Sequence, residues 1–587
     1  MALAAVVPYA RSLDFGFVWD DPFLIGPHLD VRGIGDVVRI WKTPFDTLLK
    51  DARLNRSYFR PVTLLSLAAD RASSRESPRG YHRTNVALYA AACVLLWLLA
   101  WEVSGRPAAA AAGAVLFALH PAHPESVCFI AGRTDVLSGL FVFAALWASA
   151  RFGPAIRSSW WKLLPAALLL LPGLFSKEIA LFAAPLLVLA LWIRDRRIGG
   201  WDLLRAAAPV ALAAALYLGS RLLVLGYQPL PPITPVEGTV PQILTSVAVA
   251  ARYVPLLLVP TRLSARHEVA PSTGIDPVFV AGLLTLAALA AGAWLALRRR
   301  SPWALPVGLY AATLLPICYV RLLSGAILAE RFLFVPSGAL ALAVALLPGA
   351  TWPGRGAARR EKKRGAGAAP AERDARAATP DAPPAFLAAC GIAAIWLAIL
   401  LLPRVAIWKD EGTLFLSMLR DSPESPTVHS ILGGYYYRQR DLPRSVYHYR
   451  RAIALDPGRT IDLLLNLGAA EDEMGAADSA KAHVRRLNAL EPRYGPGWYA
   501  LGNLFARGGQ PDSAVAAYER ALRFMPTLAQ AENNLGAMLE RMGRFDDALR
   551  RYRHALHVLP GYPDARNNLT RLSKERDVPL DTTWTGP

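Results

Sequence analysis

The chain has few cysteines, and it lacks the sequence marks of several common protein classes. The four cysteines are scattered in or beside apolar stretches, at Cys93, Cys128, Cys318 and Cys390. That distribution implies no disulfide framework. Residues 1–9 have neither the basic start nor the cleavage site of a signal peptide, so we interpret them as a partial first span or as the result of a start codon placed too late. No glycine-rich nucleotide loop or Rossmann pattern is visible.

The composition is that of a membrane protein with a strong positive charge. Hydrophobic residues make up 54% of the 587 residues, which is high for a soluble chain. The net charge of +19 would raise the question of nucleic acid in a soluble protein. Here much of the basic charge lies beside apolar segments, at 194–197, 298–300 and 359–364. This placement indicates positive-inside topology and contact with anionic lipid headgroups, with no nucleic-acid partner.

Apolar segments fill most of the first 402 residues and predict an all-α membrane bundle. Seven have the length of a membrane span, near 85–101, 136–150, 203–225, 278–297, 303–320, 331–348 and 385–402. Three are apolar but brief, at 107–119, 163–175 and 179–193. With a partial span at 1–9, about eleven spans result, provided that 241–260, which Arg252 and Pro255 interrupt, lies in the interface or re-enters.

The positive-inside rule orients this bundle if the N-terminus is cytoplasmic. The basic loops then fall inside, at 102–106, 151–162, 194–202, 298–302 and 355–376. The other loops fall outside, at 14–84, 120–135, 176–178, 226–277 and 321–330, together with everything after the last span. We therefore expect an integral membrane protein whose polar clusters and C-terminal domain share the extracytoplasmic side. Abundant Arg and Ala favour a bacterial chain, and hence the bacterial inner membrane.

A repeat with the period of the tetratricopeptide motif follows the membrane body. Pro457, Pro492, Pro526 and Pro560 recur at spacings of 35, 34 and 34 residues. Glycine and alanine occupy the positions where two helices of a unit approach, and proline ends the second helix. The predicted units are 426–459, 461–494, 495–528 and 529–562, with a capping helix at 563–575. The remaining divisions are a body at 1–403, with a first outer loop at 14–84 and a basic cytoplasmic loop rich in Ala, Pro and Gly at 350–384, a connector at 404–425 and a tail at 576–587.

An acidic pair, Asp20 and Asp21, directly precedes Pro22 at the start of the first outer loop. Adjacent carboxylates at a boundary between water and lipid can supply a general base, because low dielectric and a like-charged neighbour raise the pKa. The alternative is a turn or a helix cap, since Asp before Pro commonly forms a turn.

Three further polar clusters follow on the same predicted face. The first contains His120, His123 and Glu125, followed by Arg133 and Asp135. Prolines break the helix that would bring these side chains onto one face, so their spacing does not match a zinc site. Arg133 or a histidine could instead hold the phosphate of a lipid donor, although a polar loop linking two helices fits the sequence equally well. The other two clusters are the charged pairs Lys177-Glu178 and Glu330-Arg331, for which function and mutual neutralisation both stay open.

These motifs together resemble the TMTC family of transmembrane and tetratricopeptide-repeat O-mannosyltransferases, which have a GT-C membrane fold. The matching segments are 16–21, 55–62, 81–85, the run from His120 to Asp135, 176–178 and 330–337. They occur in the order and setting of that family and cover the membrane body almost end to end. The first span is shorter here, and the repeat array is short beside many relatives.

The resemblance implies an inverting transfer of one sugar from a polyprenyl-phosphate carrier to a Ser or Thr hydroxyl of a polypeptide. Asp20 or Asp21 would be the base, and Arg133, Lys177 and Arg331 are the candidates to stabilise the departing phosphate. The remaining donor-site candidates are His120, His123, Glu125, Asp135, Glu178 and Glu330. A lipid-linked donor suits the missing nucleotide loop. No cofactor is required with certainty, and the metal requirement stays open, since some GT-C enzymes use a divalent ion and others do not.

Asparagines recur on the first helices of the repeats and predict acceptor-peptide binding. Asn466, Asn534 and Asn568 share one repeat position, and Asn503 and Asn533 lie close by. A column of carboxamides on the concave face can hydrogen-bond a peptide backbone through donor and acceptor alike, and it resembles the asparagine ladder of the soluble O-GlcNAc transferase. Asn is also an ordinary filler of that position.

Three alternatives remain beside the protein glycosyltransferase. A secondary transporter would show inverted repeats and charges at the bilayer midplane, which the sequence does not. A non-catalytic membrane-anchored scaffold would need only one or two spans. A GT-C enzyme acting on a glycan or lipid acceptor stays open.

Overall fold

The computed structural model describes residues 1–25, 34–42, 58–152, 163–195, 198–226, 236, 238–319, 327–349 and 382–580. Within these ranges every regular element is helical, which confirms the predicted all-α class. The chain divides into two compact units, Met1–Ser417 and Met418–Pro587. The division falls inside the segment 404–425. The predicted features at 55–57, 153–162, 355–376 and 581–587 lie outside the described residues.

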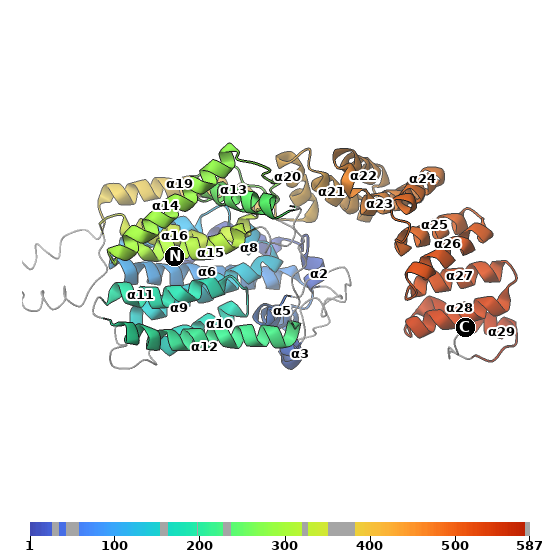
Figure 1. The fold of residues 1–587 in the computed structure, drawn as a ribbon, viewed down its shortest axis with the longest axis horizontal. Helices are drawn as coiled ribbons and strands as arrows, with labels where there is room; N and C mark the ends of the chain where they lie inside the picture. The colour runs from blue at the N-terminus through green and yellow to red at the C-terminus, as the bar shows by residue number, and fades with distance from the viewer. Residues whose placement is uncertain are drawn as a thin grey trace, which may run out of the picture. The chain divides into compact units, whose positions relative to one another are not determined.

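The first unit is a bundle of helices that lie side by side (Figure 1). Its central helices are α6 (Pro78–Ser104), α7 (Pro107–Ala118), α9 (Arg133–Phe152) and α16 (Phe334–Leu346). Around them lie α10 (Leu164–Leu174), α11 (Ala180–Arg194), α12 (Gly200–Leu225), α13 (Thr239–Leu258), α14 (Pro277–Arg298), α15 (Ala304–Cys318) and α19 (Pro384–Ala406). Short elements carry the polar loops: α1 (Ala2–Val6), η1 (Val7–Asp14), α2 (Asp21–Ile25), α3 (Val37–Lys42), α5 (Pro61–Ser74), α8 (Pro124–Val127), η3 (Ile130–Gly132) and η7 (Glu330–Leu333).

Small residues let the central helices pack closely. A Cβ atom added to Gly113 of α7 would lie 2.3 Å from the carbonyl oxygen of Ala341 in α16. One added to Gly139 of α9 would lie 2.5 Å from the ring of Phe334, also in α16. Close approach of backbones is the usual way in which helices associate in membranes, where burial of apolar surface supplies little force. The bundle therefore forms a rigid support for the loops at its ends.

Six helices in the described residues are long and apolar enough to cross a membrane: Pro78–Ser104, Ile130–Phe152, Gly200–Leu225, Thr239–Leu258, Pro277–Arg298 and Pro384–Ala406. Four shorter apolar helices accompany them: Pro107–Ala118, Leu164–Leu174, Ala180–Arg194 and Ala304–Cys318. The chain is thus a membrane protein. The helix Thr239–Leu258 has the length and composition of a span, so its predicted place in the interface and the total of eleven spans stay predictions.

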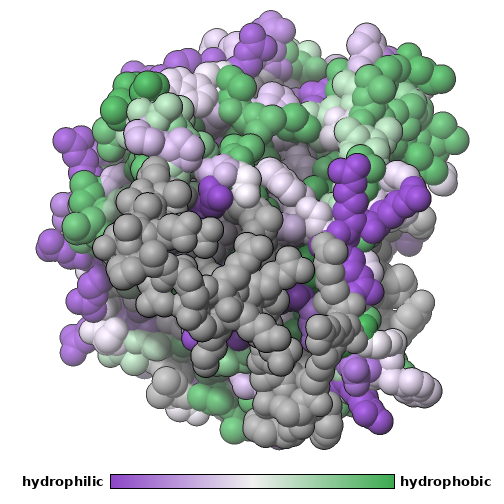
Figure 2. All heavy atoms as spheres, turned by 90° about the vertical axis from the view of Figure 1, so that its left-hand side faces the viewer, coloured by the Kyte–Doolittle hydropathy of each residue, from purple (hydrophilic) through white to green (hydrophobic). Residues whose placement is uncertain are grey.

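The two ends of the bundle differ in their polar contacts. At one end, Arg194 pairs with Glu102 at 2.5 Å, and Arg106 donates to the carbonyl oxygen of Pro348 at 2.6 Å. These contacts join the basic loops that follow α6, α11 and α16. Figure 2 views the left-hand side of Figure 1, and the coloured part of that face carries both hydrophilic and hydrophobic side chains. The predicted outer clusters all meet at the opposite end, as their contacts below show.

The second unit consists of antiparallel helix pairs. They are α21 (Pro426–Arg438) with α22 (Leu442–Leu455), α23 (Thr460–Glu473) with α24 (Ala477–Leu490), α25 (Gly495–Arg507) with α26 (Pro511–Phe524), and α27 (Ala529–Arg541) with α28 (Phe545–Val558). Helix α29 (Pro563–Glu575) follows them, and α20 (Glu411–Asp421) precedes them across the division between the units. In three of the pairs a glycine of the first helix faces a buried tyrosine of the second: Gly433 with Tyr449, Gly502 with Tyr518, and Gly536 with Tyr552.

We expect Gly433→Ala to destabilise the repeats and Gly434→Ala not to. A Cβ atom at position 433 would lie 2.6 Å from the Tyr449 ring, whereas one at position 434 would meet the hydroxyl of the same tyrosine at an ordinary 3.5 Å. Overpacking of this kind costs about 1–3 kcal/mol. At position 434 the gain in helix propensity, about 1 kcal/mol, remains. Thermal unfolding of the purified protein followed by circular dichroism measures both, and equal melting temperatures for the two variants would contradict the packing argument.

Candidate active site

The two carboxylates of the acidic pair point to different surroundings. Trp19, directly before them, has φ 55°, a left-handed conformation that residues with side chains adopt only when the fold imposes it. After this turn Asp20 is exposed, while Asp21 is fully buried as the first residue of α2. The carboxylates of Asp20 and Asp21 can therefore have different roles.

Asp21 ties the outer loop to the segment between α8 and α9. Its carboxylate accepts hydrogen bonds from the backbone N–H groups of Val18 at 3.2 Å, Ile130 at 3.4 Å and Ala131 at 2.9 Å. Burial raises the pKa of Asp21 to about 8, although these three N–H groups oppose that rise. With all three partners in the backbone, Asp21 holds the loop in place.

Asp20 faces the open side of the same loop, and no hydrogen bond of its carboxylate occurs among the described residues. Although Asp20 reaches solvent, the surrounding protein excludes part of the water around its carboxylate. This desolvation raises the pKa of Asp20, and the positive charge of Arg331 partly lowers it again. A carboxylate with these properties can accept a proton from a molecule in solution.

Aromatic residues hold this loop against the segment after α19. Phe129 stacks on Trp408, with ring centroids 5.6 Å apart, and lies 6.1 Å from Trp19 on the same measure. Trp408 is fully buried. The backbone N–H of Gly16 donates to the carbonyl oxygen of Lys409 at 3.0 Å. Residues after the last apolar helix thus form one wall of the site.

Arg331 and Lys177 both lie close to the ring of Phe332. The guanidinium carbon of Arg331 is 5.1 Å from the centre of the Phe332 ring, and the Lys177 ammonium is 5.0 Å from it. Arg331 pairs with Glu125, and Lys177 pairs with Asp135 at 2.5 Å. The Arg331 side chain is 26% exposed, so this cation can still contact a ligand.

A second pair of cations flanks Glu178. The Glu178 carboxylate accepts from Arg60 at 2.9 Å and from Arg221 at 3.4 Å. Burial raises the pKa of Glu178, but the two arginines outweigh burial, so its pKa lies below the ordinary value. Arg60 is held here because Thr63, at the start of α5, donates to the carbonyl oxygen of Ser176 at 3.3 Å.

Arg60 and Arg221 have no role predicted from the sequence, yet both lie among the predicted donor-site residues. Arg221 carried a usable signal, since it is a lone arginine in the last turns of an apolar helix, where charge is costly. For Arg60 the sequence carried no signal besides the motif at 55–62. Its partner Glu178 is more than a hundred residues away in the chain.

Four further predicted site residues are buried, and their polar atoms form hydrogen bonds or ion pairs with other groups of the chain. Arg133 is fully buried, and its guanidinium contacts Asp70 at 2.5 Å, Asn85 at 2.5 Å, Ser66 at 2.8 Å and the Tyr81 carbonyl oxygen at 2.9 Å. His123 contacts Tyr89 and Ser337, both at 2.9 Å, and His120 contacts the carbonyl oxygen of Leu257 at 3.0 Å. Glu330 accepts from Arg404 at 2.7 Å and from the Ser264 backbone at 2.5 Å, and contacts His267 at 3.2 Å. These contacts connect the loops to one another and favour a structural role.

No group of three or more His, Cys, Asp or Glu side chains is placed to hold a metal ion within the described ranges. Four partly exposed cations at this end of the bundle can face an anion: Arg60, Lys177, Arg221 and Arg331.

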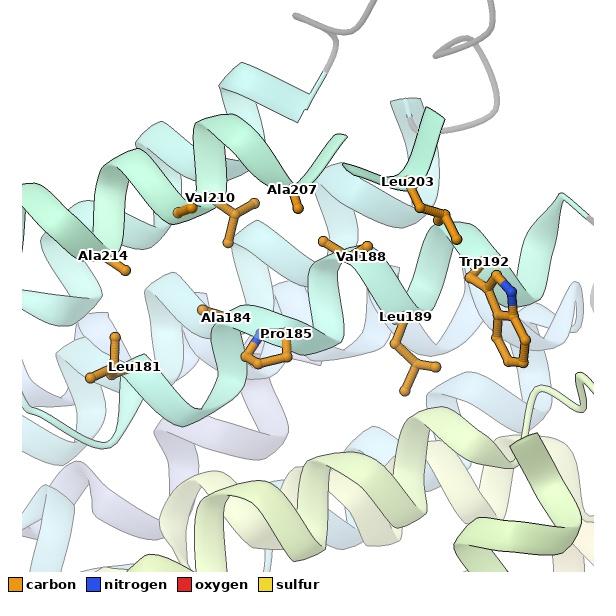
Figure 3. Close-up of a pocket in the computed structure, with 11 residues that line it drawn as sticks. Leu181, Ala184, Pro185, Val188, Leu189, Trp192, Leu203, Ala207, Val210 and Ala214 are labelled. Carbon is orange, nitrogen blue, oxygen red and sulfur yellow. The ribbon is translucent and has the colours of Figure 1, made fainter. Parts of the chain in front are cut away.

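An apolar groove lies between two helices of the bundle (Figure 3). It lies between α11 and α12, has a volume of about 650 Å³, and is lined by Leu181, Ala184, Pro185, Val188, Leu189, Trp192, Leu203, Ala207, Val210, Ala211 and Ala214. Leu181 and Ala214 are at one end of it and Trp192 at the other. Leu181 lies three residues after Glu178, and Ala214 lies seven residues before Arg221. The end of the groove at Leu181 and Ala214 is therefore the end nearer to Glu178 and Arg221 along these two helices.

In the second unit, four of the five predicted asparagines form one hydrogen-bonded chain. Asn568 donates to Asn533 at 3.0 Å, Asn533 donates to Asn534 at 3.2 Å, and Asn534 donates to Asn503 at 3.0 Å. Asn466 is exposed and lies outside this chain. A pocket of about 360 Å³ lies beside the hydrogen-bonded asparagines. It is lined by Asn503, Ala506, Arg507, Tyr518, Asn534, Ala537 and Met538.

The chain is similar to known proteins over parts of its length. The tetratricopeptide repeat family model matches residues 533–566. Protein O-mannosyl-transferase Tmtc1 of Drosophila melanogaster is 34% identical over 181 residues, which are 30% of this chain and 21% of the relative. Protein O-mannosyl-transferase TMTC4 of Homo sapiens is 30% identical over 151 residues, 23% of this chain and 20% of the relative. The chain spans about a fifth of the length of these relatives.

Among solved structures, the crystal structure of MamA protein is 21% identical, with a TM-score of 0.25, over 27% of this chain and 85% of that one. YrrB, a TPR protein with an unusual peptide-binding site, is 20% identical with a TM-score of 0.24, over 28% of this chain and 84% of that one.

Apolar helices followed by repeats define a membrane protein with a tetratricopeptide-repeat domain. Its similarity to TMTC proteins, over less than a third of this chain, agrees with the resemblance that the motifs predicted. The bacterial origin stays a prediction.

Proposed function

We propose that this protein is a membrane glycosyltransferase that moves one sugar, mannose by analogy with its relatives, from a polyprenyl-phosphate donor to a Ser or Thr hydroxyl of a polypeptide. The observation that carries the proposal is the exposed carboxylate of Asp20 beside Arg331, at the polar end of a bundle that also has an apolar groove and further cations. The names of the relatives support the sugar-transfer class.

In the proposed reaction Asp20 takes the proton of the acceptor hydroxyl. The hydroxyl oxygen forms a bond to the anomeric carbon as the bond from that carbon to the donor phosphate oxygen breaks. The phosphate leaves with the bonding electrons from the opposite face, so the configuration inverts. Arg331 and Lys177 stabilise the negative charge that develops on the phosphate. Asp21 positions the loop that carries Asp20.

We assign the groove between α11 and α12 to the isoprenoid tail of the donor. Its lining is apolar along its whole length, which suits a branched hydrocarbon chain. A tail lying there would bring its phosphate to Arg60, Arg221 and Lys177. The active end then faces the extracytoplasmic side, in agreement with the basic loops at the other end.

A transfer assay tests the proposed function. Purified protein in lipid nanodiscs receives radiolabelled polyprenyl-phosphate mannose and a peptide rich in Ser and Thr. Label on the peptide supports the proposal. Label on added lipid or glycan alone would favour a GT-C enzyme that acts on a glycan or lipid acceptor. If the donor stays intact in every reaction, a non-catalytic membrane-anchored scaffold is the better description.

We expect Arg221→Gln to weaken donor binding more than it slows turnover. The variant removes one cation near the proposed phosphate position, while Arg60 still neutralises Glu178. A hydrogen bond between charged groups contributes about 1.5–3 kcal/mol, so KM for the donor should rise roughly ten- to hundredfold. Arg205→Gln is the matched control, because Arg205 is exposed on the same helix. Equal KM values for the two variants would argue against this assignment.

A further inference from the structure

We infer that Trp408 is a positioning residue of the proposed reaction, which holds the loop of Asp20 at a fixed place relative to the loop of Arg331. The inference rests on the proposed function, since it takes Asp20 as the base and Arg331 as the cation that faces the donor phosphate. Trp408 lies two residues after α19 ends at Ala406, and it is fully buried. In this role it acts through the loops that it contacts and needs no contact with substrate.

Trp408 reaches the proposed base through Phe129. The two rings stack with their centroids 5.6 Å apart and their planes inclined by 27°. On the Phe129 side, the ring of Trp19 lies 6.1 Å away, and the backbone N–H of Ala131 donates to the carboxylate of Asp21 at 2.9 Å. Trp19 and Asp21 are the two residues that flank the base. The stack therefore supports the base from both of its neighbours in the chain.

A backbone hydrogen bond adds a second contact at the next residue. The N–H of Gly16 donates to the carbonyl oxygen of Lys409 at 3.0 Å. The carbonyl oxygen of Gly16 in turn contacts a ring nitrogen of His82, in α6, at 3.4 Å. The chain that runs from Gly16 to the acidic pair is thus attached to the segment after α19 at its beginning as well as through the stack.

The same end of α19 reaches the loop of Arg331. Arg404, four residues before Trp408, pairs with the fully buried Glu330 at 2.7 Å, and Glu330 directly precedes Arg331. A hydrogen-bonded turn joins the two positions, because the N–H of Trp408 donates to the carbonyl oxygen of Val405 at 3.2 Å. Since side chains four residues apart on such a turn are neighbours, one short segment contacts both loops. It therefore sets the distance between the base and the cation.

The proposed transfer depends on that distance. The acceptor hydroxyl has to lie within hydrogen-bond reach of Asp20, while the phosphate leaves toward Arg331 on the opposite side of the anomeric carbon. A misplacement of about 1 Å far from the chemistry can cost about 10²-fold in rate. Loss of the Trp408 ring should therefore lower kcat. Donor binding should change little, because Arg331 keeps its pair with Glu125.

The indole N–H of Trp408 contributes no hydrogen bond to these contacts. It is buried and has no partner within the part of the chain that the structure describes. The support for Phe129 therefore comes from the ring face, which an offset or tilted aromatic pair provides and an aliphatic side chain does not. Phenylalanine should consequently replace Trp408 better than leucine does.

Initial rates of Trp408→Leu and Trp408→Phe test the inference. Full-length protein in lipid nanodiscs receives labelled donor and peptide at varied concentrations, and rates are counted per folded molecule. We expect kcat to fall about tenfold or more in Trp408→Leu, with a change of less than about twofold in KM for the donor. Trp408→Phe should stay within about threefold of the parent kcat. An unchanged kcat in Trp408→Leu, or equal losses in the two variants, would overturn the inference.

The pH profile of Trp408→Leu gives a second measurement, which a loss of stability alone would not move. Desolvation raises the pKa of Asp20. A loosened loop admits water, so this pKa should fall toward its ordinary value, and the rising limb of transfer should move to lower pH. The substitution alters no charge, and the charged groups that face Asp20, which are Asp21 and Arg331, stay in the protein. A limb at the parent position would count against the inference.

Phe143→Leu is the matched control. Phe143 is fully buried in α9 and packs against Phe117 within the bundle, with ring centroids 5.8 Å apart. Its loss should lower the thermal unfolding temperature while kcat per folded molecule and the pH profile stay at parent values. Equal losses of kcat in Phe143→Leu and Trp408→Leu would mean that weakened packing alone explains the effect at Trp408.

Backbone hydrogen exchange tests the loop contacts without turnover. In Trp408→Leu, exchange should become faster in peptides that cover residues 14–21 and 127–133, and it should stay unchanged in residues 136–150 of α9. Unchanged exchange in both loops would show that Trp408 does not hold them. If the parent protein never consumes the donor, the proposed function fails, whereas the hold of Trp408 on the two loops is still decided by this measurement.

Discussion

Asp20→Asn should reduce sugar transfer by about 10²–10⁴-fold, the usual contribution of a general base, while the protein folds normally. The exposed carboxylate of Asp20 has no hydrogen bond to lose within the described residues, so the amide should fit without strain. Transfer is measured with saturating donor and peptide, and folding by the thermal unfolding temperature. Parent-level transfer by Asp20→Asn would remove Asp20 from the chemistry.

Asp21→Asn is the matched control in the neighbouring residue. The substitution replaces one of the two carboxylate oxygens by an NH₂ group. That NH₂ group faces either the backbone N–H groups of Val18 and Ile130 or the backbone N–H of Ala131. An unsatisfied buried group of this kind costs about 1–3 kcal/mol, so stability should fall. Transfer per folded molecule should fall far less than in Asp20→Asn. The opposite ranking would make Asp21 the base.

The pH dependence of transfer follows from the state that Asp20 must have. A general base works only when it is deprotonated, so transfer should rise as the pH rises through the pKa of Asp20, which desolvation places above the ordinary value for aspartate. The rising limb should therefore lie at higher pH than for an exposed aspartate.

Arg133→Met should destabilise the protein by about 3–5 kcal/mol, because it leaves the carboxylate of Asp70 buried without its charged partner. Thermal unfolding in detergent, followed by tryptophan fluorescence, measures the change. Adding Asp70→Asn to this variant should restore part of the lost stability, because the uncompensated charge is removed.

Arg221→Gln provides the contrast, since it should alter donor KM with little effect on the unfolding temperature. If Arg133→Met instead folds with parent stability and loses transfer, Arg133 contacts the donor phosphate as the sequence first indicated. Stability and KM together therefore separate a structural arginine from one that touches the donor.

The sequence predicts what depends on spacing along the chain. The proline interval predicts the helix pairs of the repeat domain, because each pair is a local unit. Apolar runs between polar loops predict that Lys177, Glu178 and Arg331 reach one end of the bundle, since successive helices alternate in direction.

The partners and exposure of each site residue could not be predicted in the same way. Asp20 and Asp21 are adjacent and chemically identical, yet their carboxylates differ in exposure and in hydrogen bonding. The difference comes from the backbone conformation of Trp19 and from N–H groups more than a hundred residues later in the chain. Arg133 has the chemistry of a phosphate ligand, but its partner Asp70 comes from a distant helix. Such pairings depend on tertiary packing, which local patterns do not contain.

The stack of Trp408 on Phe129 has a consequence for anyone who designs chimaeras of this protein. A junction placed where the last apolar run ends, near residue 403, would exchange Trp408 and Lys409 together with the repeats. The loop that bears Asp20 would then lose its contacts with these two residues. A junction after Ser417 keeps both residues with the helical bundle. Repeat domains can therefore be swapped between relatives only downstream of that tryptophan.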